Sequence, residues 1–550
     1  MRRSFPWIFM HTVLMITVVI NLLTGLRIAT VHRPALLSWS AFLPQGSLHS
    51  LHLTVALILL TIVISYGFYH LFSQHFIENK RNSGSQSKSH SKSRYHQLII
   101  YLGYSGLSLL LFTGACLYFD FLPANLILET HYIIALIILA YIPLHAGVYF
   151  VQYGSKLLTN IFVFTKKNGK ANIIFASSSI VIAISLVSVF SVNPPVPLII
   201  HQIELSIKMQ IDGFADEEIW ASIKPQRVNT FGGANFGNGS TQVQIKAVQN
   251  GIEAFFNISW QDTSQSLHHL PLLKTVNGWQ VMEDGFYHYD EKTYYEDKLA
   301  VILSNNCDLG AAGTAHLGAK PLPDKPANWH GKGYHYTTDD SIVDLWQWKA
   351  VRTNNMLLMD DNYISKPSKV LAGKRRYTAG YKTDAKRSGA YVMNWQWYTA
   401  NGITPKRLPK YMPKDSEDIQ AYQITPNSHQ AGKNKSWVIP WYDAKPYTAE
   451  LDTLAVGTVL PSVLYRSNRL EGDRADVRAF ARWQNGQWSM ELSRKLITGS
   501  KYDIELKEGI CLWLAAFDHS QTAHTRHVRP LQLQFKQETA QFEQESDNDL

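Results

Sequence analysis

The sequence predicts a fold in two parts, an α-helical transmembrane bundle followed by a mainly antiparallel β-sandwich. Long apolar runs fill residues 7–193, whereas the rest of the 550-residue chain is polar and rich in short alternating runs. This length exceeds what one compact domain usually holds. The combination excludes a fully soluble cytoplasmic protein and also a pure transporter, and three cysteines exclude a disulfide-dense scaffold.

Five apolar stretches are long enough to cross a hydrocarbon core of about 30 Å. They cover residues 7–27, 50–72, 97–119, 131–152 and 172–193. The first stretch follows Met1-Arg2-Arg3 and resembles a signal peptide at its start. Because no small-residue cleavage site follows, we expect it to remain as a membrane helix.

The basic residues beside the spans predict the orientation of the chain. Five lysines and arginines lie in residues 78–95 and four lysines in residues 153–171, whereas residues 120–130 contain none. We therefore expect a multi-pass protein of the bacterial inner (cell) membrane, with a cytoplasmic N-terminus and a large periplasmic C-terminal domain. The net charge of +9 is then partly a topology signal, and we expect no nucleic-acid partner.

Histidines in the predicted spans are functional candidates, because ionisable groups are costly in lipid. We place His52 and His131 near the outer face, and His11 and His145 near the inner face. His131 and His145 are fourteen residues apart, which puts them on one helix face and about 21 Å apart along the axis.

Two cross-helix histidine pairs at two depths match two stacked haem groups, each held by two neutral imidazoles. The alternative ligands are His49 and His70. The competing interpretation is that such histidines only anchor the span ends. The absence of a Cys-x-x-Cys-His motif excludes covalent c-type haem.

Glycines near these histidines would let a flat macrocycle approach the backbone, namely Gly25, Gly106, Gly114 and Gly147. In the order of its histidines and in the stretches FMHTVLMITVVINLLTGLRI, FTGACLY and THYIIALIILAYIPLHAGVYF, the segment 1–165 resembles a known family. The family comprises the dihaem cytochrome b membrane subunits of formate dehydrogenases and nickel–iron hydrogenases. The resemblance implies a four-helix bundle with two haems b that exchanges electrons with the quinone/quinol pool. The fifth span and a linker, residues 166–196, would then connect this bundle to the C-terminal domain.

Residues 197–535 carry short runs such as TQVQIKAVQNGIEAFFNISW and DVRAFARWQNGQWSMELSRKL, which predict an antiparallel β-sandwich. Residues 536–550 are expected to form a disordered acidic tail. No catalytic motif is present. The adjacent carboxylates Asp360 and Asp361 could hold calcium. Cys307 and Cys511 either pair in an oxidising compartment or remain two buried thiols.

Several segments of residues 210–535 resemble the haem-binding gamma subunit of ethylbenzene dehydrogenase and its relatives. They are IDGFADEEIWASI, ISWQDTSQS, VDLWQWKAVRTNNMLLMDDNYI and RKLITGSKYDIELKEGICLWLAAFDHS. The resemblance implies a β-sandwich that holds one haem b noncovalently and serves as an electron-transfer subunit for molybdenum enzymes.

The same resemblance implies which residues are the axial ligands of the haem in the C-terminal domain. One axial ligand of the family, often Met, precedes the Asp-Leu-Trp motif; here that region offers His330 and His335, and we favour His335. The second lies near the C-terminus, where HTRHVRPLQLQF offers His527, with His524 as the alternative. Replacing Met by His should lower the reduction potential.

These observations predict a membrane-bound multihaem b-type cytochrome that transfers electrons between the quinol/quinone pool and a periplasmic redox partner. That partner could be a molybdenum enzyme or a cytochrome c. The chain would be an electron-transfer component, such as the quinol-oxidising cytochrome subunit of a respiratory oxidoreductase. The alternative is a non-redox, membrane-anchored periplasmic ligand-binding or sensor protein with a β-sandwich domain.

Overall fold

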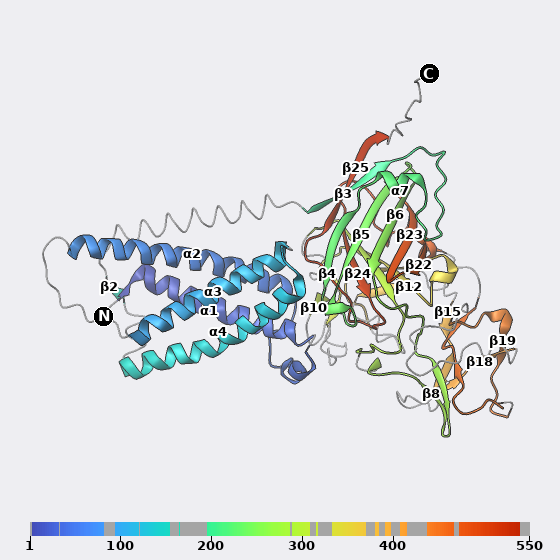
Figure 1. The fold of residues 1–550 in the computed structure, drawn as a ribbon, viewed down its shortest axis with the longest axis horizontal. Coiled ribbons are helices and arrows are strands. Elements are labelled where there is room, and N and C mark those ends of the chain that lie inside the picture. The colour runs from blue at the N-terminus through green and yellow to red at the C-terminus, as the bar shows by residue number, and fades with distance from the viewer. Residues whose placement is uncertain are drawn as a thin grey trace, which may run out of the picture. The chain divides into compact units, whose positions relative to one another are not determined.

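The chain forms two units, Met1–Pro194 and Pro195–Leu550, in the computed structural model (Figure 1). The structure describes residues 3–31, 33–81, 94–119, 121–154, 164–165, 195–286, 289–307, 315–316, 333–369, 380–383, 391–397, 407–414, 437–450, 452–466 and 472–539. The fifth predicted span, residues 172–193, lies outside these ranges.

The first unit contains four long helices that lie side by side (Figure 1). They are α1 (Phe5–Ala29), α2 (Leu48–Arg81), α3 (Arg94–Phe119) and α4 (Ala124–Tyr153). A 3₁₀ helix, η1 (Pro34–Trp39), follows α1, and β1 (Arg3–Ser4) pairs in parallel with β2 (Phe164–Thr165). All four long helices contain a stretch apolar enough to span a membrane, so the first four predicted spans are confirmed as helices of the required length.

Side chains between the four helices form one small core. Buried Val18 and Leu22 of α1 meet Leu59 of α2 and Ile134 and Ile138 of α4, and leucines of α3 pack against them. Because lipid offers the backbone no hydrogen-bonding partner, such apolar segments fold as helices, whose peptide groups bond to one another.

The second unit is built mainly of strands. Its one described α-helix is α7 (Glu218–Ser222), and its 3₁₀ helices are η3 (Gly237–Gly239), η5 (Asn354–Met356), η7 (Trp441–Asp443) and η8 (Asp473–Ala475). The strands are β3 (Val196–Gln202), β4 (Gln226–Phe231), β5 (Ser240–Gln249), β6 (Glu253–Gln261), β7 (Leu272–Thr275), β8 (Gly278–Val281), β9 (Lys298–Ser304), β10 (Ala315–His316), β11 (Tyr334–His335), β12 (Val343–Lys349), β13 (Asp360–Ile364), β14 (Tyr381–Thr383), β15 (Tyr391–Met393), β16 (Trp395–Trp397), β17 (Arg407–Pro409), β18 (Tyr411–Pro413), β19 (Ala444–Pro446), β20 (Val459–Leu460), β21 (Val463–Tyr465), β22 (Arg478–Gln484), β23 (Gln487–Lys495), β24 (Cys511–Phe517) and β25 (Leu531–Thr539). Since β25 ends at Thr539, the sheet takes in the first residues of the predicted tail.

Twelve of these strands form one sheet, in the order β14-β13-β12-β9-β24-β25-β3-β5-β6-β23-β22, with β4 beside β5. The pairs β25–β3 and β3–β5 are parallel and the other neighbours are antiparallel, which confirms the mainly antiparallel prediction. Trp348 of β12 contacts Trp260 of β6 and Trp488 of β23, with ring centroids 5.7 Å and 4.9 Å apart. The two ends of the sheet therefore face each other across a common core, as in a sandwich.

The Asp-Leu-Trp segment of β12 contributes side chains to this core. Trp346 and Trp348 are fully buried in it, and Asp344 forms an ion pair with Arg494. The calcium expected at Asp360 and Asp361 is not supported, because Asp360 is already neutralised by two basic side chains. Those side chains are Lys349 and Arg474.

Candidate functional site

Two histidines of the first unit face each other near the end of α1 and the start of α2. His52 lies in the second turn of α2 and His131 at the start of the third turn of α4. Their ring centroids are 6.4 Å apart and the ring planes are inclined by 80°. The structure therefore brings together the pair expected from matching depths.

A threonine holds each of these rings from the preceding helix. Thr24 Oγ1 of α1 lies 2.9 Å from His52 Nδ1, and Thr113 Oγ1 of α3 lies 2.9 Å from His131 Nδ1. Both hydroxyls donate to a carbonyl four residues earlier in their own helix, at 2.8 and 2.9 Å. Each oxygen can therefore accept the Nδ1–H of its histidine, and this tautomer leaves the lone pair at Nε2 for a metal.

The glycine after each threonine makes room for the ring. A Cβ atom at Gly25 would lie 3.2 Å from His52 Cε1, and one at Gly114 would lie 3.5 Å from His131 Cε1. The helix pairs α1–α2 and α3–α4 thus repeat one arrangement, in which a Thr-Gly pair faces a histidine of the next helix. Gly106 instead faces Ile138, and Gly147 has no described atom within 4 Å of such a Cβ position.

The second histidine pair lies at the other end of the bundle. His11 of α1 and His145 of α4 have ring centroids 6.5 Å apart and ring planes inclined by 42°. Trp7 stacks on His11 at 4.8 Å, and the Tyr141 hydroxyl lies 3.0 Å from His145 Nδ1. Neighbours one helical turn away therefore orient both rings.

In both histidine pairs, the distance between the ring centroids matches that of two imidazoles that bind one metal ion. An imidazole nitrogen binds a first-row metal at about 2.0 Å, so the centroids of two opposed imidazoles lie about 6.3 Å apart. The observed values are 6.4 and 6.5 Å. The four residues thus fit the bis-imidazole ligation of two haem irons. Of the alternatives, His49 lies one turn before His52, and the side chain of His70 is outside the described part of the chain.

His335 is the centre of a second histidine group, in the β domain. It lies in the short strand β11, which pairs with β10, so that Ala315 is opposite His335 and His316 is opposite Tyr334. Burial, with smaller effects of the nearby His524 and His316, lowers the pKa of His335 to about 4. The ring is therefore neutral at physiological pH, as an iron ligand must be.

His524 is the member of this group from the C-terminal region. It lies in the loop after β24, where its ring contacts Phe517 at a centroid distance of 5.0 Å. Its Nδ1 lies 2.7 Å from the Thr525 carbonyl, which fixes the Nδ1–H tautomer. Burial lowers the pKa of His524 to about 4.

His527, the residue favoured from the sequence, has a structural role. Its Nε2 accepts the backbone N–H of Leu514 at 2.9 Å, and its Nδ1 donates to the Arg529 carbonyl at 2.7 Å. Both ring nitrogens are thus engaged by the backbone, so the geometry favours the alternative, His524. His330 lies outside the described residues. His316 was not predicted as a ligand. Its ring stacks on the Tyr336 ring with centroids 3.7 Å apart, and its Nε2 lies within hydrogen-bond distance of the Tyr336 carbonyl oxygen.

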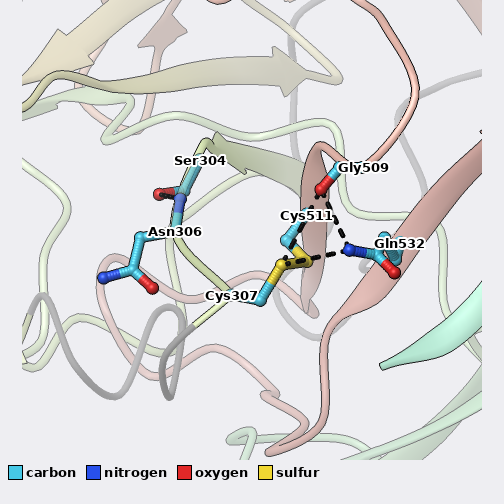
Figure 2. The surroundings of a disulfide bond; sticks show 6 residues. All are labelled: Ser304, Asn306, Cys307, Gly509, Cys511 and Gln532. Carbon is cyan, nitrogen blue, oxygen red and sulfur yellow. Dashed lines mark hydrogen bonds between the residues drawn. A yellow bond between two sulfur atoms is a disulfide. The ribbon is translucent and has the colours of Figure 1, made fainter. Parts of the chain in front are cut away.

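A disulfide joins Cys307, in the segment after β9, to Cys511 at the start of β24 (Figure 2). Their Cα atoms are 5.3 Å apart although 204 residues separate them in sequence. Beside the bond, Gln532 Nε2 of β25 donates to the Gly509 carbonyl at 3.1 Å. Of the two possibilities left by the sequence, the structure adopts the disulfide. Cys116 of α3 is a buried free cysteine.

Comparison with known proteins gives one family. The family described as ethylbenzene dehydrogenase matches residues 217–529. No curated protein matches the chain. Among solved structures, a family 9 carbohydrate-binding module from Caldicellulosiruptor kristjanssonii in complex with glucose is 8% identical, over 63% of this chain and 99% of that one, with a TM-score of 0.23. A candidate carbohydrate-binding protein from Bacteroides uniformis is 7% identical, over 62% of this chain and 100% of that one, with a TM-score of 0.26. These scores are too low to support an argument.

The fold and the histidines define a class of protein with a helical membrane anchor and a large β domain, each containing a group of partly buried histidines. Since the family match covers more than half of the sequence, the chain belongs to the ethylbenzene dehydrogenase family. The resemblance expected for the C-terminal part is thereby confirmed.

Proposed function

We propose that this protein is a membrane-bound b-type cytochrome that exchanges electrons between the quinol/quinone pool and a redox partner outside the membrane. Two haem groups would be held in the helical unit, by His52 with His131 and by His11 with His145. A third would be held in the β domain by His335 and His524. Haem supplies one-electron transfer when bound.

The observation that carries this proposal is the spacing of the two histidine pairs. Their centroid distances of 6.4 and 6.5 Å match two imidazoles on one iron. Hydroxyls fix Nδ1 of His52 and His131, so the residues of the chain prepare Nε2 for ligation. Histidines that only anchored span ends would not need to lie opposite each other on different helices.

Further support comes from the β domain. Membership of the ethylbenzene dehydrogenase family is consistent with a haem-related electron-transfer domain. The disulfide is consistent with an oxidising compartment such as the periplasm. Covalent attachment of the β domain to the membrane unit would give a high effective concentration, so that transfer between them is unimolecular. The external partner would be a periplasmic redox protein, such as a molybdenum enzyme or a cytochrome c.

The experiment that tests this function is an optical spectrum of the detergent-purified chain, recorded as dithionite-reduced minus oxidised. We expect b-type absorbance bands, and haem extraction should give three haems per chain. Addition of a quinol analogue should reduce part of the haem. If no b-type bands appear in protein produced with adequate haem supply, the cytochrome proposal is wrong, and a non-redox ligand-binding or sensor protein takes its place.

A further inference from the structure

Three buried aspartates from distant segments meet at one end of the β-sandwich. Asp262 follows β6, Asp297 directly precedes β9 and Asp518 directly follows β24. Because Phe517 of β24 pairs with Lys298 of β9, the last two aspartates lie at the same edge of the sheet. Ligand atoms of Asp297, Asp518 and His519 all lie within 4.8 Å of one another.

Asp262 belongs to the same cluster, although it follows β6, which lies in the opposite layer of the sandwich. The Ser264 hydroxyl lies 3.4 Å from Asp262 Oδ1 and 3.2 Å from Asp518 Oδ1, and so bridges the two carboxylates. Asp262, Asp297 and Asp518 are only 1%, 0% and 2% exposed. The cluster is therefore an internal feature of the sandwich and not a solvated acidic surface.

Two buried oxygen atoms at this cluster make no hydrogen bond within the described part of the chain, namely Asp262 Oδ2 and Ser266 Oγ. Ser266 lies beside the cluster because its backbone N–H donates to Asp297 Oδ2 at 2.7 Å. Buried oxygens without a partner are costly, and native proteins satisfy them with a donor, a water or an ion.

Among the described residues, the three carboxylates have one ion pair, between Asp518 and His519. Asp360 differs, since Lys349 and Arg474 neutralise it.

We propose that Asp262, Asp297 and Asp518, with the hydroxyls of Ser264 and Ser266 nearby, bind one divalent cation of the calcium type. The carboxylates and hydroxyls supply oxygen, the ligand that Ca²⁺ prefers, and His519, which lies in the same group, is paired with Asp518. The ion would join the two layers of the sandwich. It would also fix the start of the loop that carries His524, six residues after Asp518.

Calcium binding can be measured on the detergent-purified full chain after treatment with EGTA. Equilibrium dialysis against Ca²⁺ alone should give one bound ion per chain, with half-saturation at or below about 10⁻⁴ M. Saturating Ca²⁺ should raise the unfolding temperature of the β domain, followed by tryptophan fluorescence, by about 4 °C.

Three variants locate the site. Asp262→Asn with Asp297→Asn should lose Ca²⁺ binding. In EGTA this variant should unfold below the wild-type temperature, because an amide at position 297 keeps one of the two oxygens that accept the Ser266 and His519 N–H groups. Ser266→Ala removes a hydroxyl that makes no hydrogen bond to the described residues, so the fold should persist and the affinity should fall several-fold. The charge-matched control, Asp340→Asn with Glu505→Gln on the surface, should bind like the wild type.

Three outcomes would overturn the proposal. They are a wild-type chain that binds no Ca²⁺, a double aspartate variant that still binds it, and stoichiometric Zn²⁺ binding without Ca²⁺ binding. Because the readouts use Ca²⁺ and thermal unfolding, they do not depend on haem, so this proposal and the proposed function can fail separately.

Discussion

The membrane unit and the β domain position their histidines in different ways. The four histidines of the membrane unit project from long helices, whereas His335 lies in a two-residue strand and His524 in a loop. In a helix each residue advances the axis by about 1.5 Å, so sequence spacing gives depth directly. A loop has no such rule, and its path depends on contacts with distant segments. The pairing of the histidines was therefore predictable in the membrane unit and not in the β domain.

The largest effect is expected from removing a membrane ligand. His145→Ala should abolish one of the three haems, because His11 alone cannot provide both axial positions. Haem extraction and redox titration should show two haems left. His49→Ala, one helical turn from His52, is the matched control and should keep all three. Unchanged haem content in His145→Ala would reject the pairing of His11 with His145 on one iron.

In the β domain, two histidines three residues apart, His524 and His527, are expected to have different roles. His524→Ala should lose the external haem, whereas His527→Ala should keep it. His527→Ala should instead lower the free energy of unfolding by about 1–3 kcal/mol, because the Leu514 N–H loses its acceptor. Haem content and chemical denaturation separate the two effects. The reverse pattern would restore the ligand favoured from the sequence.

The disulfide should contribute to the β domain alone. Cys307→Ser with Cys511→Ser should lower the free energy of unfolding of that domain by about 2–4 kcal/mol, since the bond closes a long loop in the unfolded chain. The spectrum of the membrane haems should stay unchanged. Cys116→Ser, at the free cysteine, is the control. A double variant as stable as the wild type would show that the bond does not form.

Loss of a supporting hydroxyl should have a smaller effect than loss of a ligand. Thr24→Val keeps the shape of the side chain but removes the acceptor for His52 Nδ1–H. Haem affinity of the outer site should fall about 10–100-fold. Thr113→Val should act in the same way on His131. Thr54→Val, in the exposed first part of α2, should leave haem affinity as it is; equal losses in all three variants would indicate a general effect on the helices.

The smallest effects are expected at the two glycines. Gly25→Ala places a Cβ atom 3.2 Å from His52 Cε1, so the ring must shift by a few tenths of an ångström, whereas at Gly114 the distance to His131 Cε1 is an ordinary 3.5 Å. Gly25→Ala should move the midpoint potential of the outer haem, and Gly114→Ala should leave it nearly unchanged. Redox titration of both variants measures the difference, and identical midpoints would contradict the geometry.

Much of the site was predictable where a regular element carried it. The pairs His52–His131 and His11–His145 followed from span limits and helical rise, and the Thr-Gly repeats were visible in the sequence as LTG and FTG. In the β domain the alternating run in residues 241–260 predicted strands, and the structure has β5 and β6 there. His527 as external ligand was inferred from the resemblance and stays a prediction, whereas its contacts with Leu514 and Arg529, which favour His524, are visible only in the structure.

The sequence by itself determined the two-part organisation, the four described apolar helices and the places of the histidines along them, because apolar length and helical periodicity are local properties. The tertiary structure decided the pairing of Cys307 with Cys511, the approach of His524 to His335, and the meeting of Asp262, Asp297 and Asp518. These residues come from segments far apart in the chain. Their neighbours depend on how the twelve-stranded sheet closes on itself, which no short sequence pattern encodes.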